Sequence, residues 1–320
     1  MPSSPLPELQ VEAARRAVLA IPSPELAGLV VTGVDRVSWL NGLVTCDLAG
    51  WGADPAGEAR YALLVARSGR VLADPILIAD GERVIAALAA SLVDRLREHL
   101  DHYLVMEDAE VAPGAEAFEI WMVHGPASPG VLSAARRAGA AAGSLDRTGL
   151  GGGGIILAPV AQASAVRAAI ESAVREVGGL VGDAAGWEAL RLERGVARFG
   201  VDFDEKTYPQ EASLEKAAVS FNKGCYLGQE VVCMLEMRGH VKRKLVSIVL
   251  DATGAGERPG AAVADETGAP VGEITSLALS PTLGVPVGFA MLKRAQAVEG
   301  ARIVVGGAGG ANATVVARPA

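Results

Sequence analysis

A short segment of the chain brings together several side chains that can do chemistry. An ammonium, a thiol, a phenol, an amide and a carboxylate follow one another closely, at Lys223, Cys225, Tyr226, Gln229 and Glu230. Two glycines flank the thiol and permit a tight, left-handed backbone around it. The ammonium of Lys223 could stabilise the Cys225 thiolate. The residues alone leave two interpretations open, a reactive thiol loop and a structural turn in which Cys225 is an inert apolar residue.

The sequence does not indicate a metal site held by this chain alone. The four histidines lack the partner spacing of a local zinc site. Three cysteines are one short of the four thiolates that an iron-sulfur cluster usually takes. The glycine-rich run at 149–154 has the letters of a dinucleotide-binding motif, but a strand-like segment follows it where a helix should begin. We therefore interpret that run as a loop and predict no metal ligands.

Length and charge narrow the class of protein. With 320 residues, 50% hydrophobic and 21% charged, the chain should form two or three globular domains. A net charge of −8 without runs of like charge argues against direct nucleic-acid binding. No apolar stretch approaches the roughly 20 residues of a membrane span, and the N-terminus does not resemble a signal peptide. Few, scattered cysteines favour a reducing compartment, so we expect a cytoplasmic protein without membrane partners.

Hydrophobic patterns and turn residues predict two successive α+β units and a late β region. In the first unit we expect strands at 29–32, 61–65, 71–78 and 84–88, with helices at 34–43 and 91–102, the second helix capped by Ser91. In the second we expect strands at 119–123 and 155–157 and helices at 129–138 and 163–177. Short strands at 246–250, 262–264, 271–277, 287–292 and 301–305 predict a small C-terminal β-barrel or sandwich.

The chemical segment also carries a family resemblance. Lys-Gly-Cys-Tyr-Leu-Gly-Gln-Glu at 223–230 resembles the K-G-C-[YF]-x-G-Q-E signature of the YgfZ-type folate-binding proteins, relatives of the glycine-cleavage T protein. Weaker similarities lie at 33–47, 68–72, 192–200 and 208–211, so that the resemblance covers about residues 28–295. Trp39 stands where the family usually has Phe.

This resemblance implies a fold and a domain plan. The fold would be α+β and T-protein-like, with two ferredoxin-like units around a central tetrahydrofolate pocket and a C-terminal β-barrel. We expect a folate-binding region at 1–240, with units at about 28–112 and 117–185 and the signature segment at 187–240, followed by the barrel at 241–320.

The resemblance also implies roles for individual residues. In the T protein, an aspartate matching Asp47 supports aminomethyl transfer and a glutamate matching Glu193 holds the pterin. A carboxylate suits the pterin because it accepts two hydrogen bonds from the ring's donors. The expected catalytic residues are thus Cys225, Lys223 and Asp47, and the expected cofactor-binding residues are Glu193, Tyr226, Gln229 and Glu230. From the residues alone, Asp47 could equally be a turn residue and Glu193 a surface helix residue.

A folate tail is anionic and would need a basic site. The candidates from the sequence are Arg191, Arg194, Arg238, Lys242, Arg243 and Lys244. These side chains could equally be solvated surface charges.

Three functional hypotheses follow. The first is a folate-binding accessory protein that supports iron-sulfur cluster assembly or repair, and thereby tRNA modification by iron-sulfur enzymes, with iron-sulfur client or assembly proteins as partners. The second is a tetrahydrofolate-dependent aminomethyltransferase or demethylase of the T-protein type. The T protein lacks the signature around Cys225, which favours the first hypothesis over the second. The third is a folate-binding scaffold without chemistry.

Overall fold

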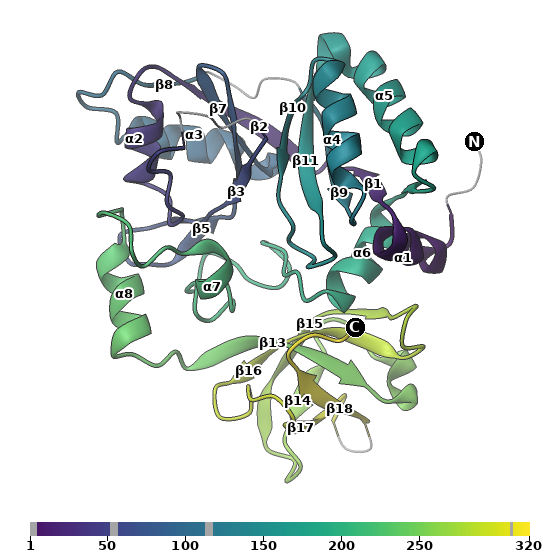
Figure 1. Ribbon diagram of the computed structural model, residues 1–320. Coiled ribbons are helices and arrows are strands. Elements are labelled where there is room, and N and C mark those ends of the chain that lie inside the picture. The colour runs from purple at the N-terminus through teal and green to yellow at the C-terminus, as the bar shows by residue number, and fades with distance from the viewer. Residues whose placement is uncertain (1–4, 52–56, 113–117, 308–309) are drawn as a thin grey trace.

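The computed structural model describes residues 5–51, 57–112, 118–307 and 310–320. Two units of sheet and helix stand side by side, and a β-barrel lies beneath both of them (Figure 1). The expected α+β class with a C-terminal barrel is therefore confirmed. In the described ranges, no helix is both long and apolar enough to cross a bilayer.

The first unit is a five-stranded sheet in the order β3-β6-β7-β2-β8. Its strands are β2 (Leu26–Thr32), β3 (Ala59–Tyr61), β6 (Ile76–Asp80), β7 (Arg83–Ala89) and β8 (Glu110–Val111). Helices α2 (Arg36–Asn41) and α3 (Val93–Asp101) pack on its outer face. In α3 the buried residues recur at the spacing of one helix face, as at Leu96 and Leu100.

Three predictions for this unit were wrong in detail. The strand expected at 61–65 is divided at residues 62–63 between β3 and a separate short strand, β4 (Leu64–Val65), which does not join the five-stranded sheet. The strand expected at 71–78 is interrupted at Asp74 and Pro75, because proline has no N–H to continue a ladder. Its first part, β5 (Val71–Ala73), instead pairs with β4 (Leu64–Val65) in a separate hairpin. Ser91 is not a helix cap: residues Ala90–Leu92 form a 3₁₀ turn, and α3 begins after it with no side-chain cap.

The second unit is a five-stranded sheet in the order β10-β11-β9-β1-β12. Its strands are β1 (Leu19–Pro22), β9 (Phe118–His124), β10 (Ala141–Ser144), β11 (Gly153–Pro159) and β12 (Leu180–Val181). Helices α4 (Ser128–Arg137) and α5 (Ala163–Glu176) cover one face. Strand β1, which the sequence pattern did not reveal, pairs with β9 and β12, and helix α1 (Pro7–Arg16) precedes it.

The inner faces of the two sheets pack against each other. Alternate residues of β9 show this: Trp121 and Val123 pack under α4 and α5, whereas Ile120 and Met122 join a core shared with the first sheet. At Gly28 the approach is so close that a Cβ atom would lie 2.6 Å from the ring of Phe118. The two sheets thus form one closely packed central layer.

A linking segment joins the second unit to the barrel. It contains α6 (Ala184–Glu193), the short α7 (Glu215–Ala218) and α8 (Gln229–Met237). The barrel closes in the order β13-β16-β15-β14-β17-β18. Its strands are β13 (Arg243–Leu250), β14 (Ala262–Ala264), β15 (Pro270–Leu279), β16 (Pro286–Lys293), β17 (Arg302–Val305) and β18 (Ala311–Val316), and a 3₁₀ turn (Ala252–Gly256) follows β13.

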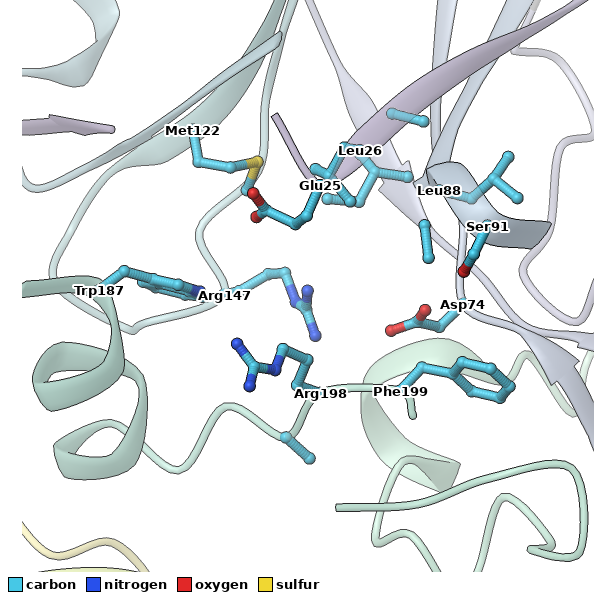
Figure 2. A pocket seen from close by; sticks show the side chains of 14 residues that line it. Glu25, Leu26, Asp74, Leu88, Ser91, Met122, Arg147, Trp187, Arg198 and Phe199 are labelled. Atoms are coloured by element: carbon cyan, nitrogen blue, oxygen red, sulfur yellow. The ribbon is translucent and has the colours of Figure 1, made fainter. Parts of the chain in front are cut away.

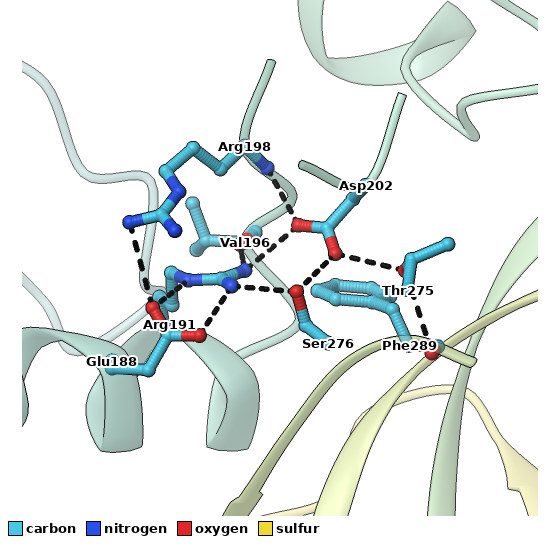
Figure 3. A network of polar contacts seen from close by, with 8 residues as sticks. All are labelled: Glu188, Arg191, Val196, Arg198, Asp202, Thr275, Ser276 and Phe289. Atoms are coloured by element: carbon cyan, nitrogen blue, oxygen red, sulfur yellow. Dashed lines mark hydrogen bonds and ion pairs between the residues drawn. The ribbon is translucent and has the colours of Figure 1, made fainter. Parts of the chain in front are cut away.

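A buried polar network connects this segment to the barrel (Figure 3). The guanidinium of Arg191 is fully buried and donates to Asp202 at 2.8 Å, to Glu188 at 2.7 Å and to the hydroxyl of Ser276 at 2.8 Å. Asp202 also accepts hydrogen bonds from the hydroxyls of Thr275 and Ser276, on β15. A buried charge is tolerated only when it is matched in this way.

We predict that Arg191→Met destabilises the fold by about 3–5 kcal/mol, because it leaves Asp202 buried and without its counter-charge. Denaturant unfolding measures the loss. The control is Arg16→Met, which removes an exposed ion pair with Glu12 and should cost about 1 kcal/mol or less. Equal losses in the two variants would show that the network does not hold the barrel in place.

Candidate functional site

A cavity of about 300 Å³ lies where the two units and the linking segment meet. Both sheets contribute to its wall, as do the start of α6 and the loop after it. Figure 2 shows the side chains that face it. Those with polar or aromatic groups are Glu25, Asp74, Ser91, Arg147, Trp187, Arg198 and Phe199.

Asp74 is the most perturbed carboxyl group of this wall. It occupies the break between β5 and β6, and the hydroxyl of Tyr61 donates to it at 3.1 Å. Burial raises the pKa of Asp74 to about 6, although the positive charge of Arg147 and the Tyr61 hydrogen bond act in the opposite direction. A carboxyl group that titrates near neutral pH can accept and return a proton under cellular conditions.

Arg147 comes from a loop organised by its neighbour Asp146. The Asp146 carboxylate accepts hydrogen bonds from the backbone N–H groups of Gly149, Leu150 and Gly151. This loop leads into β11, which begins at Gly153, so residues 149–152 of the glycine-rich run form a loop as predicted and its last two glycines belong to the strand. The guanidinium carbon of Arg147 lies 3.9 Å from the centroid of the Tyr61 ring. The loop therefore brings a cation from the second unit to the Tyr61–Asp74 pair of the first.

Arg198 and Glu25 complete the charged wall. The backbone N–H of Arg198 donates to Asp202 at 2.9 Å, and its guanidinium lies 3.6 Å from Glu188, so the Arg191 network positions it. Glu25 is exposed just before β2, and its carboxylate points toward the cavity (Figure 2). Two guanidinium groups and two carboxyl groups thus face one small volume, which suits a ligand with hydrogen-bond donors and an anionic part.

The residues predicted from the sequence are placed elsewhere. Among the described residues that line the cavity, none belongs to the predicted set Cys225, Lys223, Asp47, Glu193, Tyr226, Gln229 and Glu230. The basic candidates for a folate tail are likewise absent from its lining. The roles inferred for these residues stay predictions, and the structure shows where each of them lies.

Lys223 joins the signature segment to the first unit. Its ammonium is buried and donates to the carbonyls of Asn41, Val44 and Cys46 at 2.7, 2.8 and 2.6 Å. Burial lowers its pKa to about 8, against the attraction of Cys46 and Asp47. All three N–H groups of the Lys223 ammonium therefore donate to backbone carbonyls. The two sequence blocks that carry the family resemblance, 33–47 and 223–230, are brought together by this one side chain.

Cys225 is exposed, and the residues after it are held firmly. Gly228 has φ of 79°, and a Cβ atom there would lie 2.4 Å from the carbonyl oxygen of Ala66, so no other residue fits. Tyr226 is buried with its ring 5.2 Å from the Lys223 ammonium, and burial raises the pKa of its hydroxyl. Gln229 and Glu230 begin α8, and Glu230 faces solvent. The thiol therefore lies at the surface, between the buried side chains of Lys223 and Tyr226.

Glu193 and Asp47 both lie away from the cavity. Glu193 is fully buried and accepts hydrogen bonds from Arg15, Ser280 and Thr282. Burial would raise the pKa of its carboxyl group, but these hydrogen bonds outweigh it and the pKa is lowered. Asp47 is half-buried and accepts a hydrogen bond from the backbone N–H of Ala49, as a turn residue does.

The cavity residues themselves were missed by sequence reasoning. Asp74, Arg147, Trp187 and Arg198 come from four separate segments and show no common spacing. The interruption of a strand by Asp74-Pro75 and the glycine-rich loop beside Arg147 are the local signals that could have drawn attention to them. In the described ranges, no cluster of three or more His, Cys, Asp and Glu side chains could hold a metal ion.

Comparison with known proteins agrees with this architecture. Residues 243–320 match the glycine cleavage T-protein C-terminal barrel domain. The chain is 31% identical over 264 residues to human IBA57, a mitochondrial iron-sulfur cluster assembly factor, covering 77% of this chain and 70% of that protein. It is 28% identical over 276 residues to an aminomethyltransferase of Rubrobacter xylanophilus, covering 81% of this chain and 71% of that protein.

A solved structure confirms the fold. The aminomethyltransferase T of the glycine cleavage system from Bartonella henselae superposes with a TM-score of 0.81 at 23% identity, covering 98% of this chain and 89% of the other. The predicted T-protein-like fold is therefore confirmed. The chain belongs to the T-protein-like superfamily, which contains both aminomethyltransferases and the assembly factor IBA57.

We predict that Asp74→Asn makes the protein more stable than wild type at pH 7 but not at pH 4. The pKa of Asp74 is raised from 3.8 to about 6 in the folded protein. At a pH between these two values, the folded state therefore holds a proton that the unfolded state has lost. The free energy of unfolding of the wild type therefore falls as the pH rises between these two values, whereas that of Asp74→Asn does not fall for this reason. Denaturant unfolding from pH 4 to 7 measures it. A pH-independent difference between the two proteins would contradict the raised pKa.

Proposed function

We propose that this protein binds tetrahydrofolate in the central cavity and supports the assembly or repair of iron-sulfur clusters. The observation that carries the proposal is its 31% identity to IBA57 over 70% of that protein, together with a T-protein-like fold around a charged cavity. Support for iron-sulfur enzymes would extend indirectly to those that modify tRNA. Three free cysteines in the described chain accord with a reducing, cytoplasmic setting.

The cavity has side chains of the kinds that tetrahydrofolate requires. The pterin ring presents an amino group and ring N–H donors, for which the carboxylates of Glu25 and Asp74 are acceptors. The anionic tail requires cations, and Arg147 and Arg198 face the same volume. Hydrogen-bond acceptors and cations therefore line one cavity. When bound, the cofactor would supply a carrier for one-carbon units.

Cys225 is the residue we assign to the iron-sulfur role. Its thiol is exposed, as contact with a client or assembly protein requires, whereas Cys46 and Cys233 are partly buried. Burial raises the pKa of the Cys46 thiol to about 11 and also raises that of Cys233, which disfavours their thiolates. Lys223 contributes by holding the turn on the first unit, which fixes the position of the thiol.

A second candidate function, aminomethyl transfer to tetrahydrofolate, is favoured by Asp74. Its raised pKa and its contact with Tyr61 place a proton-transfer group in the cavity. Formation of methylenetetrahydrofolate from an aminomethyl donor by wild type, and its loss in Asp74→Asn, would support this function. If the protein binds tetrahydrofolate but forms no methylenetetrahydrofolate, the result favours the accessory role over aminomethyl transfer.

We predict that wild type binds tetrahydrofolate and that Arg147→Gln weakens binding by about tenfold or more, because a charge-assisted contact is lost. Isothermal titration calorimetry on folded proteins measures both affinities. The matched control is Arg175→Gln, which removes the same charge from an exposed position in the last turn of α5, outside the cavity lining. If wild type binds no folate, or if Arg175→Gln weakens binding as much as Arg147→Gln does, the central cavity is not the folate site.

We predict that Cys225→Ala fails to restore iron-sulfur enzyme activity in a deletion strain, although the purified variant binds tetrahydrofolate like wild type. The thiol lies on the surface and outside the cavity, so its removal should leave the folate site intact. Cys233→Ala is the control and should restore activity. Full activity with Cys225→Ala would remove this thiol from the mechanism.

A further inference from the structure

One side of the central cavity is formed by an aromatic pair. Trp187, in the first turn of α6, lines the cavity and is half-buried. Its indole lies parallel to the imidazole of His124, with ring centroids 4.5 Å apart and an interplanar angle of 5°. Figure 2 shows the indole extending from α6 toward Arg147. Trp187 therefore lies between the imidazole of His124 and the charged groups of the cavity.

His124 is an unusual residue to find behind this wall. It ends β9 and is 1% exposed, yet neither ring nitrogen has a hydrogen-bond partner among the described residues. A buried polar group without a partner is unfavourable, and an apolar ring would fill the same space without that penalty. Burial, together with the nearby charge of Arg147, lowers the pKa of His124 to about 3, so the imidazole is neutral at physiological pH.

The orientation of Trp187 is fixed from two directions. Asp183 caps α6 by accepting hydrogen bonds from the backbone N–H groups of Ala185 and Gly186. This cap sets the backbone of the helix turn that carries Trp187, and the flat ring of His124 sets the plane of the indole. A preformed aromatic surface of this kind binds a planar ring at a low entropic cost, because no side chain must be ordered on binding.

We propose that Trp187 is the surface against which a planar, polar ring of the ligand packs, and that His124 is the positioning residue that holds the indole in place. This inference rests on the proposed function, in which the ligand is tetrahydrofolate and the ring is its pterin or aminobenzoyl part. It specifies which wall of the cavity would contact the ring of the ligand. Neither residue is part of the signature segment at 223–230.

The test is calorimetry with tetrahydrofolate on four variants that are shown to be folded. Trp187→Ala should weaken binding by about tenfold, and His124→Ala by a smaller factor, because stacked aromatic pairs contribute about 0.5–1.5 kcal/mol. His124→Phe keeps a flat ring behind the indole and should bind like wild type. The control is Trp121→Phe, which alters an indole on the opposite face of β9 and should leave affinity unchanged.

A spectroscopic measurement separates direct contact from general loss of structure. In ¹⁵N-labelled protein, the indole N–H signal of Trp187 is the one missing from Trp187→Phe. Tetrahydrofolate should shift this signal by its ring current in wild type and in His124→Phe. An unshifted signal, or wild-type affinity in Trp187→Ala, overturns the inference and leaves the folate site in place. Wild type that binds no tetrahydrofolate overturns the proposed function, and this inference with it.

Discussion

The cavity depends on one buried guanidinium. Arg191 has no exposed surface, so its charge must be met by fixed partners, and these come from three parts of the chain: α6 itself, the loop that contains Asp202, and Ser276 on the barrel. Because a charge left unmatched in this interior is strongly unfavourable, the three parts are held in one arrangement. α6 carries Trp187, and the loop carries Arg198 and Phe199, so the same interaction sets one side of the cavity.

The signature segment acts first as a structural clamp. Lys223 uses its ammonium on three carbonyls of the 41–46 turn, and Gly228 lets α8 begin against the hairpin of the first unit. A lysine in this role cannot also donate a hydrogen bond to Cys225, because its three protons are engaged. The unusual composition of the segment therefore reflects two demands: docking of the linking segment, and presentation of a thiol at the surface.

The sequence predicted the class of fold and most elements, but none of the predicted site residues lines the cavity. Strands such as β7 and helices such as α3 follow from local patterns of burial, which a single sequence contains. Strand β1 was missed because it belongs to a sheet whose other strands begin about 100 residues later. Glu193 shows the same limit: it lies on a helix, but its partners Ser280 and Thr282 come from the barrel, and only the fold shows that they occupy its carboxylate.

The cavity and the thiol-bearing turn are separate surfaces, yet one hairpin contacts both. The hairpin of β4 and β5 meets α8 at its turn, where a Cβ atom on Gly69 would lie 2.9 Å from Val231, and β5 ends directly before Asp74. The strands of the hairpin are largely buried, whereas Arg67 and Ser68 at its tip are exposed. The same packed element therefore supports α8 at one end and leads into the cavity carboxyl group at the other.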